Sequence, residues 1–365
     1  YKRQVVVYDQ RPKLGGMLRY GIPDYRLPQD KLDADIDFIL STGIEVHTGV
    51  SIGRDISFAE IENQYDAVYI SIGAHNDKKI GIPGEDAVGV HSAVQLLRDI
   101  GEGRVPDFKG KRVCVIGGGN VSMDATRTAI RLGASAVTCV YRRRVTDMTA
   151  LAEEIEEAQS EGCQILSLQA PDHIETDETG RVTALWTRPQ VIGAYGKDGR
   201  PRPYDADQPL LRTPCDVVIV AIGQSIDAKP FEQIAPVVRG KIQAESKEFV
   251  PNTPHVFAGG DAVTGPATVI RAVAAGKVAA ANIDAHLGFR HVIKSDVEIP
   301  APHLTNMPAC GRIELRSRPA EECVGNFDLV KCGMTEQEVH QETSRCLRCD
   351  HFGYGIFKGG RSSKW

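Results

Sequence analysis

A glycine triplet at residues 117–119 separates a β-branched strand pattern from a helix pattern, and this feature most restricts the possible fold. A strand–glycine–helix order is typical of a dinucleotide site. There the first glycine makes a tight turn, and a later one lets the backbone approach a pyrophosphate at the helix N-terminus. We therefore expect Gly117, Gly119, Asn120 and Val121 to line such a site. An ordinary tight turn is the alternative interpretation.

The next strand pattern, residues 136–141, ends in three arginines and decides which dinucleotide is expected. A site for NAD places an acidic residue about 20 residues past the glycines, where it binds the ribose 2′-hydroxyl. Arg142, Arg143 and Arg144 stand here instead, and guanidinium groups suit a 2′-phosphate that a carboxylate would repel. The pattern favours NADP(H), held by Arg142 and Arg143; a solvated basic turn is the alternative.

A second dinucleotide site is indicated at the start of the chain. Residues 5–8 read as a short strand that ends at Asp9, where a carboxylate would bind the ribose of an adenine dinucleotide. Such a site needs a glycine loop about 20 residues upstream, and eight residues precede Asp9. Either Asp9 is a surface residue, or the sequence lacks the first strand and glycine loop of this domain. We favour the second interpretation.

Strand and helix patterns alternate along the rest of the chain, which predicts parallel sheets with crossover helices. Apolar residues at helical spacing predict helices, and short β-branched runs predict strands. Helices are expected at residues 30–40, 152–159 and 267–287, strands at 67–72, 112–116, 217–220 and 256–257, and an antiparallel hairpin at 165–187.

Composition excludes several classes of protein. The longest apolar run is far shorter than the ~18 residues that span a bilayer, and a net charge of -5 gives no support for nucleic-acid binding. Nine scattered cysteines make a poor disulfide framework, so a reducing, cytoplasmic location is expected.

The C-terminal region holds five of the nine cysteines. Thr335 and Glu338 form a capping box for a short helix, and Cys346 and Cys349 form a C-x-x-C pair at its end. The two thiols are candidate ligands for zinc or an iron–sulfur cluster, which would need further thiolates from this region or a partner. Buried free cysteines at a helix end are the alternative. Residues 350–365 are expected to form an arm that docks on a partner.

The motifs, taken in order, resemble those of the glutamate synthase small-subunit family, whose members are FAD- and NADPH-binding proteins of the pyridine nucleotide-disulfide oxidoreductase superfamily. The resemblance covers nearly the whole chain. Two features depart from the family: its N-terminal cysteine-rich iron–sulfur domain is absent from the sequence, and Met148-Thr149 stands where Met-Pro is usual. The segments that carry the resemblance are 14–28, 65–74, 82–85, 117–124, 141–144, 221–224, 257–261, 272–281 and 345–350.

The resemblance implies a set of FAD contacts, beginning with Asp9 on the ribose. The N-terminus of the helix that follows residue 267 would face the pyrimidine end of the flavin, where a helix dipole stabilises negative charge. The remaining implied contacts are Gly15, Gly16 and Leu18 at the flavin and pyrophosphate, Gly260 and Asp261 at the ribityl and phosphate region, Thr268 and Val269 at the pyrimidine, and Gly73 and Gly223 at turns between domains.

The expected fold is α/β, with two interleaved doubly wound (Rossmann-like) domains and a C-terminal tail. Residues 1–105 and 245–290 would form the FAD domain, 106–244 the NADPH domain and 291–365 the tail. The expected function is hydride transfer between NADP(H) and FAD, with electrons passing to iron–sulfur clusters in a partner subunit, and we nominate no catalytic acid or base. A module of an electron-bifurcating or transhydrogenase complex and a non-catalytic NADPH-binding docking fragment are the alternatives.

Overall fold

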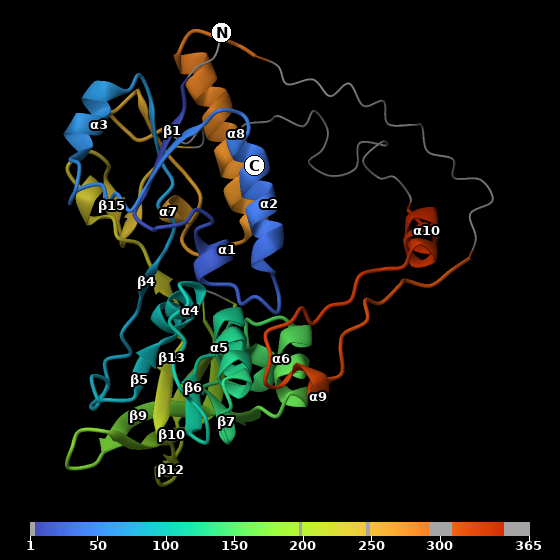
Figure 1. Ribbon diagram of the computed structural model, residues 1–365. Coiled ribbons are helices and arrows are strands. Elements are labelled where there is room, and N and C mark those ends of the chain that lie inside the picture. Colours follow the sequence, from blue (N-terminus) through green and yellow to red (C-terminus); the bar gives the residue numbers. More distant parts are fainter. Residues whose placement is uncertain (1–3, 197–198, 246–248, 292–308, 347–365) are drawn as a thin grey trace. The chain divides into compact units, whose positions relative to one another are not determined.

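Five apolar strands form a parallel sheet in the computed structural model, which describes residues 4–196, 199–245, 249–291 and 309–346 (Figure 1). None of the helices in these residues is long and apolar enough to cross a membrane. Contacts divide the chain into two units. Unit 1 contains Tyr1–Val50, His75–Ser225 and Arg318–Val330, and unit 2 contains Ser51–Ala74, Ile226–Ser317 and Lys331–Trp365.

The five-stranded sheet belongs to unit 1, and each neighbouring pair in it is parallel. Its order is β5 (Val90–Ser92), β13 (Val217–Val220), β6 (Arg112–Ile116), β7 (Ala136–Tyr141) and β8 (Gln164–Ser167).

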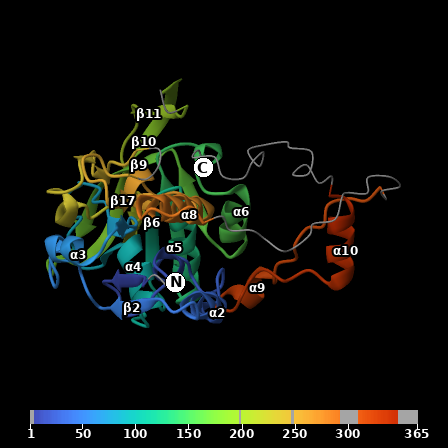
Figure 2. The same cartoon turned by 90° about the horizontal axis from the view of Figure 1, so that it is seen from above.

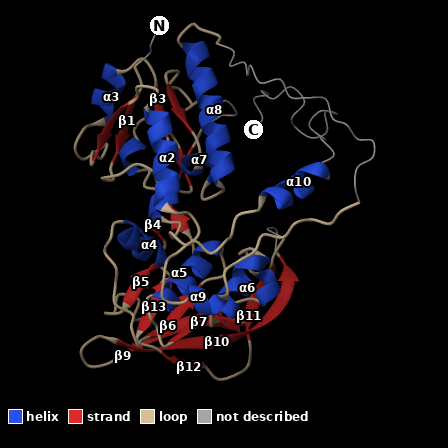
Figure 3. Cartoon of the chain, turned by 45° about the vertical axis from the view of Figure 1, so that its right-hand side comes forward, coloured by secondary structure: helices blue, strands red, loops and turns tan. Residues whose placement is uncertain are grey.

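Helices cover one face of this sheet and a second sheet covers the other (Figure 3). Val113 and Val115 of β6 pack on the helical side, whereas Cys114 and Ile116 pack against the second sheet. Because both faces are buried, the strands read as uninterrupted apolar runs. The covering elements are α4 (Ala93–Gly101), α5 (Asn120–Arg131) and α6 (Ala152–Ser160) on one side, and the antiparallel β9 (Gln169–Thr176), β10 (Val182–Tyr195), β11 (Pro201–Asp205) and β12 (Leu211–Pro214) on the other.

The hairpin predicted over residues 165–187 is wrong in its first part. Residues 164–167 form β8, the fifth strand of the parallel sheet, and the hairpin consists of β9 and β10. Leu168 separates β8 from β9 with φ 57°, a left-handed conformation that redirects the chain between the two sheets. A non-glycine residue rarely adopts this conformation, so the sequence pattern does not reveal the break.

The N-terminal part of unit 1 contains the strand and helix predicted there. β1 (Val6–Asp9) pairs in parallel with β2 (Glu45–Thr48). The other elements of this part and of the remainder of unit 1 are α1 (Met17–Tyr20), α2 (Gln29–Leu40), η1 (Val145–Asp147) and α9 (Ala320–Cys323).

Unit 2 is built around the parallel pair β3 (Val68–Ile70) and β17 (Val256–Ala258). The rings of Phe58 and Phe231 meet edge to face in its core at a centroid distance of 5.7 Å. The other elements of this unit are α3 (Phe58–Gln64), η2 (Lys229–Phe231), β15 (Val237–Val238), β16 (Lys241–Ile242), α7 (Asp261–Thr264), α8 (Val269–His286) and α10 (Glu336–Ser344).

Two of the points at which the chain passes between the units lie beside each other. β4 (Asn76–Asp77) follows the passage after Ala74 and pairs antiparallel with β14 (Gln224–Ser225), which directly precedes the passage after Ser225. Gly73 and Gly223 come just before these passages with φ of 68° and 118°, a range that favours glycine. The predicted division into an FAD domain (1–105 and 245–290), an NADPH domain (106–244) and a tail (291–365) stays a prediction.

A buried cluster of charged side chains joins three segments of unit 1. Arg127 and Arg131 of α5 lie over the ring of Tyr25, at 4.8 and 3.9 Å from its centroid. Both guanidinium groups also bind Glu161, through Nη2–Oε1 distances of 2.7 and 2.9 Å. The third segment, Arg318–Val330, packs against Tyr25. The backbone N–H of Val330 donates to the Tyr25 carbonyl (2.9 Å), and Val330 and Cys323 share a buried apolar cluster with Tyr25.

The same cluster continues through Arg26. Its guanidinium binds the carboxylate of Asp124 (2.9 Å) and that of Glu154 (2.7 Å). Burial raises the pKa of the Asp124 carboxyl to about 6, against the lowering effect of Arg26. Asp124 is therefore a carboxylate that folding makes harder to ionise.

We expect Glu161→Gln to lower the free energy of unfolding by about 3–5 kcal/mol, because it leaves two buried guanidinium groups without their shared carboxylate. Urea denaturation followed by far-UV circular dichroism measures this loss. Glu156→Gln, an exposed position on α6, is the matched control and should change the free energy by less than about 0.5 kcal/mol. Equal, small effects of the two substitutions would contradict the role given to Glu161.

The pKa of Asp124 predicts a pH dependence of stability. The folded chain binds this proton more tightly than the unfolded chain, whose value lies near 3.8. Its contribution to stability is therefore fully present below about pH 4 and is lost as the pH rises through about 6. The stability of the wild type relative to Asp124→Asn should fall by about 1.4 kcal/mol between pH 5 and pH 7.5, measured by urea denaturation. A constant difference would contradict the raised pKa.

Candidate dinucleotide site

The turn from β6 into α5 begins at Gly117, whose φ is 150°. A Cβ at this position would lie 2.3 Å from the carbonyl oxygen of Ala221 and equally close to Oγ of Ser122. Ser122 is fully buried, donates from Oγ to the Ala221 carbonyl (3.2 Å) and accepts from the N–H of Gly119 (3.3 Å). These contacts explain why the turn needs glycine first and a small residue at position 122.

Gly118 lies against the ring of Tyr141, the last residue of β7. A Cβ on Gly118 would stand 2.5 Å from a ring carbon, so the ring and the glycine loop fit each other only without a side chain there. The carbonyl of Gly118 accepts from the N–H groups of Thr149 (2.8 Å) and Ala150 (3.0 Å). The loop after η1 is thereby fastened to the glycine loop.

Asn120 also holds the loop after η1, because its Oδ1 accepts from the N–H of Leu151 (3.0 Å). Asn120 and Val121 are predicted to contact a cofactor. The side chain of Asn120 instead holds the neighbouring loop, while the N–H groups of both residues have no acceptor in the described part of the chain. Free N–H groups and the positive end of the α5 dipole make this turn suited to a phosphate.

The three arginines after β7 have different surroundings. Arg142 is exposed, and its guanidinium makes no hydrogen bond or ion pair with any described residue. Arg143 is buried and donates from Nε to the carbonyl of Pro201 (2.8 Å). Arg144 binds both carboxylate oxygens of Asp147, at 2.8 and 3.0 Å. Of the two arginines predicted to bind a 2′-phosphate, Arg142 is the one that the fold leaves accessible.

In unit 1, the residues predicted for FAD lie between the end of β1 and the first turn of α1. Asp9 accepts from the N–H of Arg11 (2.8 Å), and burial raises the pKa of its carboxyl. Gly15 and Gly16 have φ of 124° and 52°, and Gly16 directly precedes α1. Leu18 is half-buried on α1.

In unit 2, the predicted FAD residues lie at the starts of α7 and α8. Gly260 precedes α7 with φ 65°, and Oδ1 of Asp261 accepts from the N–H of Ala267 (3.1 Å). Burial raises the pKa of the Asp261 carboxyl. Thr268 and Val269 stand exposed at the start of α8, and Thr268 does not cap the helix with its side chain.

The tail cysteines do not form a metal site in the residues that the structure describes, which hold no group of three or more possible ligands. The predicted capping box is confirmed, since Thr335 and Glu338 exchange side-chain to backbone hydrogen bonds at the start of α10. The helix ends at Ser344 with Arg345 as its C-cap, so Cys346 directly follows the helix end. Cys346 is exposed beyond the helix, and Cys349 lies outside the described residues.

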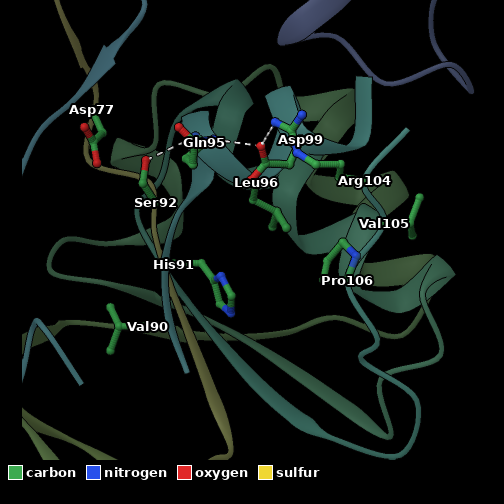
Figure 4. Close-up of a pocket in the computed structure, with 10 residues that line it drawn as sticks. All are labelled: Asp77, Val90, His91, Ser92, Gln95, Leu96, Asp99, Arg104, Val105 and Pro106. Atoms are coloured by element: carbon green, nitrogen blue, oxygen red, sulfur yellow. Dashed lines mark hydrogen bonds and ion pairs between the residues drawn. The ribbon is translucent and has the colours of Figure 1, made fainter. Parts of the chain in front are cut away.

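A separate hollow of about 560 Å³ lies beside edge strand β5 (Figure 4). Three of its polar residues are bound to one another: Ser92 caps α4 by accepting from the N–H of Gln95 (3.3 Å), and Nε2 of Gln95 donates to Asp99 (2.7 Å). His91 meets Phe108 edge-on, and burial lowers the pKa of its ring. Because β13 separates β5 from β6, the hollow is not part of the glycine loop site.

A strand, a glycine loop and a helix on a parallel sheet, with an arginine-rich strand end, define a dinucleotide-binding α/β protein. Residues 5–276 match the family described as pyridine nucleotide-disulphide oxidoreductase, and the chain belongs to this family. The prediction of an oxidoreductase that resembles the glutamate synthase small subunit is confirmed at this level.

Two relatives and one solved structure illustrate the similarity. The NADP(+)-dependent formate dehydrogenase subunit beta of Moorella thermoacetica is 34% identical over 371 residues, covering 98% of this chain and 52% of that protein. The glutamate synthase (NADPH) small chain of Halomonas elongata is 34% identical over 294 residues, covering 76% and 62%. FprA of Mycobacterium tuberculosis in complex with NADPH superposes with a TM-score of 0.67 at 19% identity over 78% of each chain.

The likeness to FprA confirms the predicted α/β fold of dinucleotide-binding domains. The chain spans about half the length of the first curated relatives that it matches.

Gly119→Ala tests the glycine loop as a binding element. Its Cβ would meet no atom closer than 3.5 Å and its φ of -104° suits alanine, so the free energy of unfolding should change by less than about 0.5 kcal/mol. Affinity for NADPH, measured by calorimetry, should nevertheless fall at least about tenfold, because the methyl group would hold a pyrophosphate away from the backbone. Gly118→Ala should lower stability through its clash with Tyr141. Unchanged NADPH affinity in Gly119→Ala would contradict the site.

Proposed function

We propose that the chain is the NADPH-binding flavoprotein part of a multisubunit oxidoreductase. The observation that supports this best is the site at β6, α5 and β7, where a glycine turn, free helix N–H groups and an accessible arginine follow one another. Such a site suits the pyrophosphate and the 2′-phosphate of NADP(H). Membership of the pyridine nucleotide-disulphide oxidoreductase family supports the same function.

The residues of this chain fit NADP(H) in named roles. Gly117 and Gly119 would let the backbone approach the pyrophosphate, and the N–H groups of Asn120 and Val121 would donate to it. Arg142 would bind the 2′-phosphate, while the burial of Arg143 and its bond to Pro201 give that residue a supporting role.

The residues predicted for FAD also fit their roles. Asp9 stands at a strand end with a partly buried carboxylate, and Gly15 and Gly16 have backbone conformations that keep side chains away from a bound group. Asp261 and the start of α8 would serve the flavin end, where the helix N-terminus stabilises negative charge. Bound FAD supplies a two-electron acceptor for hydride that can release electrons one at a time.

Partner subunits are part of the proposal. The relatives from Moorella thermoacetica and Halomonas elongata are named as a beta subunit and a small chain, which supports assembly of this chain with other subunits. An iron–sulfur protein or subunit would then accept the electrons. Cys346 and Cys349 remain candidate cluster or zinc ligands only if further thiolates complete the set.

Anaerobic titration of the purified chain tests the function. We expect a visible flavin absorption band that NADPH bleaches much faster than NADH does. The reason is that the residue directly after β7 is an arginine, where a site for NAD has a carboxylate. A colourless protein that still binds NADPH would contradict the flavoprotein function and support the docking fragment. Equal bleaching by the two nucleotides would contradict the assignment of NADPH.

A further inference from the structure

The thiol of Cys139 holds the start of the glycine loop. Cys139 lies on β7 with its side chain fully buried, and its Sγ donates to the carbonyl oxygen of Gly117 at 3.3 Å. The N–H of Gly117 in turn donates to the carbonyl of Val140 on the same strand (3.0 Å). Strand β6 and helix α5, which the glycine loop connects, lie side by side (Figure 2). Two bonds to β7 therefore fix both backbone polar groups of the residue at which the chain leaves β6.

The bond from Cys139 sets the orientation of the peptide group between Gly117 and Gly118. A trans peptide is planar, so its carbonyl and its N–H point in opposite directions. Because the Gly117 carbonyl points toward Cys139, the N–H of Gly118 points away from it. Gly118 is a buried residue, and its N–H has no acceptor among the residues that the structure describes. An N–H in this situation is rare in a folded protein, and a phosphate oxygen bound at the turn would supply the acceptor.

The surroundings of Cys139 keep its thiol protonated, and the protonated thiol is the form that donates. Burial raises the pKa of Cys139, and the neighbouring thiol of Cys163 raises it further. The two cysteines belong to one apolar cluster, together with Met123 of α5 and Ala150 after η1. Cys163 donates to the carbonyl of Gln164 (3.4 Å), which lies on β8 and outside the glycine loop. Two buried thiols of the same cluster thus hold different parts of the chain, which makes Cys163 a matched control.

We propose that Cys139 is a positioning residue of the dinucleotide site, whose thiol fixes the Gly117–Gly118 peptide so that the turn presents its N–H groups to the pyrophosphate of NADP(H). The side chain acts through this peptide and does not itself touch the nucleotide. This inference rests on the proposed NADP(H) function. The alternative is that Cys139 only fills space in the apolar cluster.

Two nucleotides separate these roles, because 2′-phospho-ADP-ribose contains the pyrophosphate and adenosine 2′-monophosphate does not. Calorimetry on the full chain gives the Kd of each. Cys139→Val nearly keeps the side-chain volume and removes the donor. It should weaken binding of 2′-phospho-ADP-ribose about 3- to 10-fold, because a hydrogen bond to a charged group is partly lost, and leave the monophosphate unchanged. Cys139→Ser retains a donor and should recover most of the loss, whereas Cys163→Val should leave both Kd values unchanged.

Carbonyl carbon NMR of the free chain gives a readout that does not depend on binding. The Gly117 carbonyl resonance should shift in Cys139→Val, because the bond from the thiol is lost, and should stay in place in Cys163→Val. A Gly117 resonance that stays in place in Cys139→Val would contradict the role given to the thiol.

Equal weakening of the two nucleotides by Cys139→Val would overturn the proposal, since a general loosening of the cluster would disturb the whole site. An unchanged Kd for 2′-phospho-ADP-ribose would also overturn it. Gly119→Ala keeps this result distinct from a failure of the proposed function. If Gly119→Ala weakens binding of 2′-phospho-ADP-ribose and Cys139→Val does not, the NADP(H) site stands without the role of Cys139. If the wild type binds both nucleotides with the same Kd, the turn binds no pyrophosphate and the NADP(H) function itself fails.

Discussion

The structure of unit 1 depends on a buried cluster in which Arg127 and Arg131 lie over the ring of Tyr25 and bind Glu161. Two guanidinium groups over one ring would repel each other if no carboxylate were present, and Glu161 supplies that carboxylate. The side chain of Glu161 is 3% exposed. Hydrogen bonds from Arg131 and Arg127 outweigh burial and lower the pKa of Glu161. The cluster therefore stays ionised while it joins the segment after α1, the helices α5 and α6, and the loop that ends at Val330. A charged anchor of this kind imposes one arrangement, because each group is costly to bury without its partners.

Helix α5 contributes two arginines to this anchor, and the dinucleotide turn lies at the start of the same helix. Its first turn offers free N–H groups, and its buried face holds Arg127 and Arg131. Movement of the segment around Tyr25 would thus disturb the helix whose N-terminus faces the expected phosphate. We infer that the anchor stabilises the geometry of the site as well as the fold, although none of its residues belongs to the site.

Local sequence patterns predicted both ends of some strands. Other features of the structure depend on contacts between residues that are distant in the sequence. The bounds of β6, β7 and β13 agree with the sequence patterns, because burial on both faces requires unbroken apolar runs. The α10 capping box is likewise local. The burial of Arg143 depends on Pro201, 58 residues later, and no spacing rule reveals it. The surroundings of Tyr25 depend on two arginines about a hundred residues away. The boundary between β8 and β9 consists of one residue with positive φ, Leu168, and the sequence pattern does not reveal it.

The charge at the end of β7 explains how this site can favour a 2′-phosphate in spite of a nearby carboxylate. Asp147 lies on η1, directly after the arginines, and its charge would repel the phosphate if it were free. Arg144 binds both its oxygen atoms, and this pairing lowers the pKa of Asp147 so that the carboxylate remains a fixed partner. Arg144 neutralises Asp147, and Arg143 holds the β10–β11 hairpin through Pro201. Of the three consecutive arginines, Arg142 is therefore the cation that stays accessible.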